Sequence, residues 1–183
     1  MCALVDNKYS VLMDSFVAFT GIRSDARESG KVDLSQIDWV FPTTLLPVIT
    51  FLRCNPGYQC VPPREPQVDC YIGRMLSKGY SADRLGKSYV PIVPLPVNQR
   101  ELNPLLKQLY VLNSEGRDLG GENAFKLLIG EMVNNIFEHS AFGHAFVMAQ
   151  KYANKGFVEL CFCDDGVGIH GSLKRPVWCL TTT

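Results

Sequence analysis

Residues 131–139 read Glu-Met-Val-Asn-Asn-Ile-Phe-Glu-His, and residues 164–169 read Asp-Asp-Gly-Val-Gly-Ile. Both clusters combine residue types that a packed core does not select. Apolar residues recur at three- and four-residue steps around the first cluster, which predicts an amphipathic helix. That helix would carry five polar residues on neighbouring faces: Glu131, Asn134, Asn135, Glu138 and His139. Glu131, Asn135 and His139 are spaced four residues apart, which is about one helical turn.

Two adjacent asparagines in mid-helix need a reason beyond propensity, because Asn is a mediocre helix former. The Asn side chain offers a neutral carbonyl oxygen to a hard cation such as magnesium. Glu131 offers a base to an attacking water or hydroxyl. The other interpretation is a solvated polar face on a helix that ends at Gly143. This cluster alone does not decide between the two.

The second cluster follows a predicted hairpin. Ala145–Tyr152 and Phe157–Cys163 are apolar, partly alternating runs on either side of a turn at residues 154–156. The chain leaves the second run directly into Asp164, whose carboxylate can accept a hydrogen bond from an exocyclic amine. The glycines after it let the backbone approach a flat ring or a phosphate. Taken alone, the cluster is a weak signal, and its ordinary interpretation is a surface turn.

A helix with Glu-x3-Asn-x3-His, then a hairpin, then Asp-x-Gly-x-Gly resembles the GHKL ATP-binding superfamily over about Leu119 to Leu173. That group contains gyrase-type ATPases, sensor histidine kinases, mismatch-repair ATPases and anti-sigma-factor serine kinases. The resemblance implies helices over a mixed sheet, with ATP and Mg2+ as cofactors. It implies ATP binding, with ATP hydrolysis or serine/threonine phosphoryl transfer in regulatory signalling as the activities to test.

The resemblance also assigns roles. Asn135 would coordinate the magnesium, and Glu131 would be the general base. Asp164 would bind the adenine amino group, while Gly166 and Gly168 would shape the adenine pocket. The resemblance also assigns Asn134 and His139 of the helix to cofactor binding. His139 matches the histidine found in the anti-sigma kinase branch.

The sequence departs from the family after Gly168. No second Gly-x-Gly follows, and residues 176–183 do not resemble a lid. The triple Thr end suggests a frameshifted or prematurely stopped gene, a hypothesis that fails if no frame downstream encodes a second glycine box. We expect the chain as given to bind ATP weakly or not at all, and to be inactive as an ATPase or kinase. The alternative is a non-catalytic regulatory or interaction module, or a truncated gene product.

Composition bounds the remaining possibilities. The formal net charge of zero argues against a basic footprint for nucleic acid. No apolar run is long enough to cross a membrane and no signal peptide is recognised, so we expect a cytoplasmic protein. The seven cysteines lack a Cys-x2-Cys pair, which favours reduced core cysteines over a zinc site. The resemblance leaves room for a signalling protein partner and for a homodimer.

The sequence predicts an α/β protein in two parts, a small α/β module over residues 1–96 and a partial GHKL domain over residues 97–183. The first part should contain a short helix closed by Gly21, one or two strands in residues 31–41, and a helix over residues 43–52. Most of the 11 prolines fall in residues 54–96, which predicts a linker around one helix at residues 68–79. Another helix is expected at residues 102–112.

Residues 32–46 also faintly resemble the strand-turn-helix of STAS domains, which are anti-sigma-factor-antagonist modules with a phosphorylated serine at that turn. Pro42 occupies the corresponding place and Thr43 follows it, so the usual phospho-acceptor is absent or shifted. An unrelated β-α unit remains the alternative.

Overall fold

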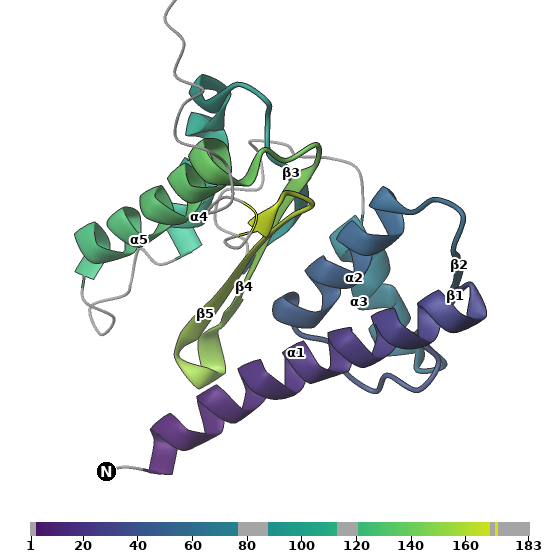
Figure 1. The fold of residues 1–183 in the computed structure, drawn as a ribbon. Coiled ribbons are helices and arrows are strands. Elements are labelled where there is room, and N and C mark those ends of the chain that lie inside the picture. Colours follow the sequence, from purple (N-terminus) through teal and green to yellow (C-terminus); the bar gives the residue numbers. More distant parts are fainter. Residues whose placement is uncertain (1–2, 77–87, 113–120, 169–170, 172–183) are drawn as a thin grey trace, which may run out of the picture.

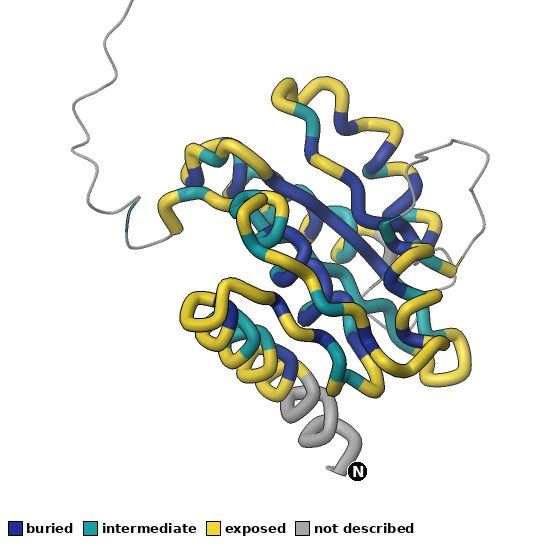
Figure 2. The backbone as a smooth tube through the Cα atoms, turned by 90° about the vertical axis from the view of Figure 1, so that its right-hand side faces the viewer, coloured by how far each residue is buried: buried dark blue, intermediate teal, exposed yellow. Residues whose placement is uncertain are grey.

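The protein is a mixed α/β structure, as the sequence predicts. The computed structural model describes residues 3–76, 88–112, 121–168 and 171. A three-stranded sheet lies at the centre, with α2 and α3 against one face and α4 and α5 against the other (Figure 1). Buried backbone runs through the middle of the molecule and exposed backbone lies on the outer helices (Figure 2). No helix among the described residues is both long and apolar enough to cross a membrane.

The central sheet has the order β3-β4-β5, and both pairs are antiparallel. Its strands are β3 (Tyr89–Pro94), β4 (Ala145–Tyr152) and β5 (Phe157–Asp164). The predicted hairpin is confirmed: β4 and β5 pair in unbroken register, from Tyr152 opposite Phe157 to Ala145 opposite Asp164. Gly156 closes the turn with φ +68°, a conformation that favours glycine. The sequence predicts a mixed sheet, whereas the three described strands of this sheet are all antiparallel.

Strand β4 separates two hydrophobic cores, because side chains alternate across a strand. Phe146 and Met148 pack among residues of the N-terminal helices. Ala145, Val147 and Ala149 pack among residues of α4 and α5. All five are less than 5% exposed, so β4 is buried on both faces. The sheet thus ties the two halves of the chain into one packed body.

The first core is built mainly from residues before β3. It contains α1 (Ala3–Ser29), β1 (Lys31–Asp33), α2 (Pro42–Cys54), β2 (Gln59–Val61) and α3 (Pro66–Leu76), with β1 and β2 paired in parallel. The helix expected over residues 43–52 is present as α2, which begins at Pro42, since proline fits a first helical position, and continues past Pro47 to Cys54. The strand-turn-helix order at residues 31–54 is present, while the likeness to STAS domains stays a prediction.

One expectation for the N-terminal half is wrong and another is met only in part. Helix α1 does not close at Gly21 but continues to Ser29, where Gly30 ends it in the left-handed conformation with φ +72°. Of the one or two strands expected in residues 31–41, one is present, and it stops at Asp33, whose carboxylate accepts a hydrogen bond from the Ser35 backbone N–H at 2.8 Å. This local bond turns the chain out of the strand.

The proline-rich stretch is more ordered than a linker, because it contains β2, α3 and β3. Strand β3 tolerates Pro91 and Pro94 because it is an edge strand, and its pairing with β4 is irregular between Val90 and Val93. Strand β3 lies before the predicted domain boundary at residue 96, yet it pairs with β4, which lies after that boundary. The sheet therefore takes strands from both sides of the predicted domain boundary.

The second core is covered by α4 (Asn103–Leu112), with the short η2 (Gln99–Leu102) before it, and by α5 (Gly121–Asn135). Helix α5 continues as one π-helical turn, η3 (Ile136–Ser140). The helix predicted around residues 131–139 is thus present. It ends at Ser140, capped by Ala141 with φ 49°, rather than at Gly143.

Candidate functional site

Helix α5 and η3 bury one stripe of residues and leave the polar one exposed. Ile129, Val133 and Ile136 are at most 6% exposed and belong to the second core. Glu131, Asn135 and His139 are exposed, as expected from their one-turn spacing. The arrangement allows these side chains to meet a ligand at the surface of the helix.

The two asparagines differ in their contacts. The Asn134 side-chain oxygen accepts a hydrogen bond from the Gln99 side-chain amide at 3.0 Å. Within the described residues, neither Asn135 nor Glu131 has a side-chain hydrogen bond or ion pair. Among the described residues, the side chain of His139 has one polar neighbour, Glu138, whose Oε2 lies 3.8 Å from Nε2 at the surface. Asn135 is therefore the asparagine whose amide is available to a cation.

The structure brings the end of the polar helix against the glycine motif. The Val167 backbone N–H donates a hydrogen bond to the Ser140 carbonyl oxygen at 2.9 Å. A Cβ on Gly166 would meet that same carbonyl oxygen and would lie 2.7 Å from the Ser140 Cβ. Only glycine lets the two segments approach this closely.

The glycine motif has a fixed backbone around Asp164, the last residue of β5. The Asp164 Oδ1 accepts a hydrogen bond from the Gly166 backbone N–H at 2.9 Å. Its Oδ2 accepts none within the described part of the chain. Gly168 has φ +64° and open space around it. One oxygen of Asp164 thus shapes the loop while the other stays available.

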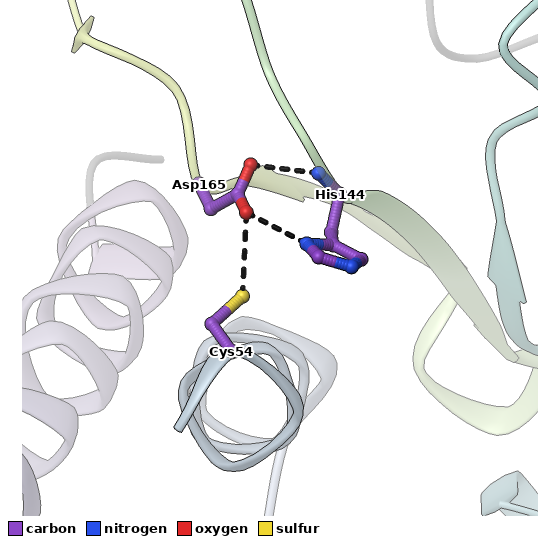
Figure 3. Close-up of side chains that lie close together, drawn as sticks. All are labelled: Cys54, His144 and Asp165. Atoms are coloured by element: carbon purple, nitrogen blue, oxygen red, sulfur yellow. Dashed lines mark hydrogen bonds and ion pairs between the residues drawn. The ribbon is translucent and has the colours of Figure 1, made fainter. Parts of the chain in front are cut away.

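The neighbouring carboxylate, Asp165, lies on the α2 side of the sheet, where it meets Cys54 and His144 (Figure 3), whereas Asp164 pairs with Ala145 of the second core and so lies on the other face. Its Oδ1 accepts hydrogen bonds from the backbone N–H groups of Gly143 and His144, both at 2.7 Å. Its Oδ2 lies 2.8 Å from Nδ1 of His144 and accepts a hydrogen bond from the Cys54 thiol at 3.5 Å. Three residues distant in sequence therefore converge at one end of the sheet.

The electrostatics of this cluster argue against a catalytic nucleophile. Burial raises the pKa of the Cys54 thiol, and the hydrogen bond to Asp165 raises it further, so the thiol stays protonated at neutral pH. Burial also raises the pKa of Asp165, but hydrogen bonds from His144 and Gly143 outweigh this and lower it to about 2. The Asp165 carboxylate is therefore ionised at neutral pH and resists protonation.

Sequence reasoning missed this cluster. Asp165 counted only as the variable residue of the glycine motif, and Cys54 as one of several core cysteines. No spacing signal could reveal the contact, because 111 residues separate Cys54 from Asp165. The assignment of reduced cysteines holds for the five described ones, all free thiols, but Cys60 and Cys70 are exposed and not in a core.

A half-buried carboxylate, Glu159, lies at the start of α2. Glu159 of β5 accepts hydrogen bonds from the backbone N–H of Thr43 at 3.1 Å and from its hydroxyl at 2.7 Å. Burial raises the pKa of Glu159, although the two bonds from Thr43 act in the opposite direction. The contact joins α2 to the sheet, and it occupies the hydroxyl that the likeness to STAS domains placed next to a phospho-acceptor position.

A cavity of about 700 Å³ lies away from both polar clusters, between α1 and residues 33–44. Four aspartates and two aromatic residues are among its lining: Asp14, Asp25, Asp33, Asp38, Trp39 and Phe41. It contains no residue of the glycine motif or of the polar helix. Its size alone does not make it the functional site, because the convergent chemistry lies at the end of the sheet.

Comparisons of this chain with protein-family models, with curated proteins and with solved structures found no match. The functional conclusions below are therefore drawn from the geometry of the two polar clusters.

Proposed function

We propose that this chain binds ATP with magnesium where the polar helix meets the glycine motif. One observation carries the proposal: Val167 and Gly166 pack directly on the carbonyl of Ser140. The polar helix and the glycine motif, which are the two predicted parts of the site, therefore lie next to each other. Ser140 lies five residues after Asn135, roughly 7 Å along a helix axis. The distance suits a nucleotide whose base lies at the glycine motif and whose phosphates extend along the helix.

In this proposal, the role of each residue depends on which of its polar atoms have no hydrogen-bond partner among the described residues. The available Oδ2 of Asp164 accepts a hydrogen bond from the adenine amino group. Gly166 and Gly168 keep side chains away from the flat ring. The exposed amide of Asn135 supplies a ligand to magnesium, and Glu131 orients or deprotonates the group that attacks the terminal phosphate. Asn134, with its amide oxygen bound to Gln99, supports the helix rather than the cation.

The donor set fits a magnesium nucleotide, since magnesium prefers oxygen ligands and binds through one or two protein groups plus phosphates. When bound, magnesium would neutralise phosphate charge during phosphoryl transfer. The chain as given carries no second Gly-x-Gly after Gly168, so the adenine end supplies most of the affinity. We accordingly expect weak binding.

The test is calorimetric titration of the purified chain with magnesium and a non-hydrolysable ATP analogue. We expect saturable binding that Asp164→Asn weakens tenfold or more. Asp69→Asn, an exposed aspartate on α3, is the matched control and should bind as the unaltered chain does. Absence of binding by a chain shown to be folded would overturn the proposal, as would equal loss in the control.

A second pair of variants tests the helix. Asn135→Ala should abolish the magnesium dependence of binding, whereas Asn134→Ala should keep it, because the Asn134 amide oxygen is already bound to Gln99. If nucleotide is turned over, Glu131→Ala should stop turnover and preserve binding. Equal effects of the two asparagine variants would remove Asn135 from the metal-binding role.

A regulatory or interaction module is the second candidate, and one surface favours it. Met13, Phe16 and Val17 on α1 are between 60% and 62% exposed, an unusual set of side chains to leave in water. Covering them with a second copy would give a homodimer. Light scattering should then show a dimer that Phe16→Ser with Val17→Ser converts to monomer. A monomer at all concentrations would leave this candidate without support.

A further inference from the structure

The cluster of Cys54, His144 and Asp165 is the strongest unassigned constellation in the described residues. One sulfur, one imidazole nitrogen and one carboxylate oxygen all lie within 4.8 Å of one another. The three residues come from the end of α2, the residue before β4 and the residue after β5 (Figure 3). We propose that they form a binding site for a divalent transition metal of the zinc class.

The distances fit tetrahedral coordination. Zinc bonds of 2.0–2.3 Å place neighbouring ligand atoms about 3.3 to 3.6 Å apart. The Cys54 Sγ lies 3.5 Å from the Asp165 Oδ2, which already meets this requirement. The His144 Nδ1 lies 2.8 Å from the same oxygen, a hydrogen-bond distance. An arriving metal needs to part these two atoms by about half an ångström and to set the separation of the Cys54 Sγ and the His144 Nδ1, which is at most 4.8 Å, to about 3.5 Å.

The backbone holds two of the three ligands in place before any metal arrives. The Asp165 Oδ1 accepts the N–H groups of Gly143 and His144, which leaves Oδ2 facing the thiol and the imidazole. The Asp165 N–H in turn donates to the His144 carbonyl at 3.0 Å. Hydrogen bonds of this kind orient ligating carboxylates in known metal sites. The carboxylate is thus oriented independently of the metal.

The donor set selects the metal. A thiolate disfavours magnesium and calcium, which take oxygen ligands, and a carboxylate disfavours copper(I), which prefers soft ligands. Sulfur, imidazole and carboxylate together suit zinc, and cobalt(II) as its spectroscopic substitute. The His144 side chain is 59% exposed, so solvent can reach the metal. Three protein ligands then leave a fourth position for water, as in zinc sites that bind or activate a ligand.

Binding requires proton loss that the site can accommodate. The Cys54 thiol gives its proton to solvent and binds as thiolate, and the imidazole carries its remaining proton on Nε2 when Nδ1 binds the metal. The site is separate from the proposed nucleotide site, because Asp165 and Asp164 point to opposite faces of the sheet. The metal proposal therefore does not depend on nucleotide binding.

Cobalt(II) titration of the purified, metal-stripped full chain under reducing conditions tests the proposal. We expect one cobalt per chain, with intense visible bands of tetrahedral cobalt and a thiolate-to-cobalt charge-transfer band in the near ultraviolet. Zinc should displace the cobalt and abolish both signals. Cys54→Ser should remove the charge-transfer band, and Asp165→Asn and His144→Asn should each weaken binding at least tenfold.

Matched controls separate this site from other ligands on the chain. Cys60→Ser removes an exposed thiol on β2, and His139→Gln removes an exposed imidazole, so both should bind cobalt as the unaltered chain does. Asp164→Asn should also keep cobalt binding, whatever its effect on nucleotide. Circular dichroism confirms that each variant is folded. The proposal is overturned if the folded chain gives no charge-transfer band, or if Cys54→Ser keeps the band.

Discussion

Asp164 and Asp165 are adjacent in the sequence but belong to different environments. Asp164 turns toward the α5 side, where its motif packs on Ser140 at the end of the polar helix. Asp165 turns toward the α2 side, where it meets two backbone N–H groups, an imidazole and a thiol. The two carboxylates therefore have different surroundings, because a different helix covers each face of the sheet. A motif in sequence does not define one site when a strand end has two faces.

The largest effect should come from the two glycines beside these carboxylates. Gly166→Ala forces a Cβ against the Ser140 carbonyl and should lower the free energy of unfolding by about 2 kcal/mol or more. Gly168→Ala meets no atom within 4 Å, so only its left-handed φ of +64° opposes the substitution, at a cost of about 1 kcal/mol. Urea unfolding followed by circular dichroism measures both. Equal losses would mean that Gly166 does not pack on the helix end.

The next test exchanges the two aspartates. Asp164→Asn should weaken the ATP analogue tenfold or more, about 1.4 kcal/mol, and leave cobalt binding unchanged. Asp165→Asn should do the opposite, because the hydrogen bonds of its side chain, within the part of the chain that the structure describes, go to the α2-side cluster and to the turn at Gly143 and His144. Calorimetry and cobalt spectroscopy on both variants give four results. Loss of both ligands in both variants would show one coupled site instead of two faces.

The difference between the faces also explains what could be predicted from the sequence. The α5 side was predictable because its parts lie within about forty residues: helical periodicity located Asn135, and the hairpin led to Asp164. The α2 side was not, because Cys54 reaches Asp165 only after α2 packs against β5. The proline content likewise prevented the prediction of β3. Proline is normally disfavoured in a strand because it cannot donate a backbone hydrogen bond, but it is tolerated in a strand at the edge of a sheet. Long-range packing, not local pattern, decides both features.

Glu159 should give a smaller, pH-dependent effect on the α2 side. The folded state holds its proton more tightly than the unfolded chain, because burial raises its pKa from the ordinary 4.5. Its contribution to stability is complete below pH 4.5 and is lost as the pH rises through the raised value. Glu159→Gln keeps an oxygen that can accept both Thr43 hydrogen bonds but does not ionise. The variant should therefore gain stability relative to the unaltered chain as the pH rises above 4.5.

Urea unfolding at several pH values measures this difference. Glu28→Gln, at an exposed position near the end of α1, is the control and should leave the pH profile unchanged. A Glu159→Gln profile parallel to that of the unaltered chain would show that the carboxyl is not desolvated. A fall in stability at every pH would instead show that charge at the start of α2 matters more than burial.

The smallest effect concerns α1 and compares its two glycines. Gly21 lies in mid-helix, and a Cβ at this position would meet no atom within 4 Å, so Gly21→Ala should raise the free energy of unfolding by about 0.5 to 1 kcal/mol. Gly30 is equally open but has φ +72° at the helix end, so Gly30→Ala should lower it by about 1 kcal/mol. Urea unfolding distinguishes the signs. Losses at both positions would mean that the helix closes at Gly21 after all, as the sequence pattern alone predicts, and that residues 22–29 do not continue it.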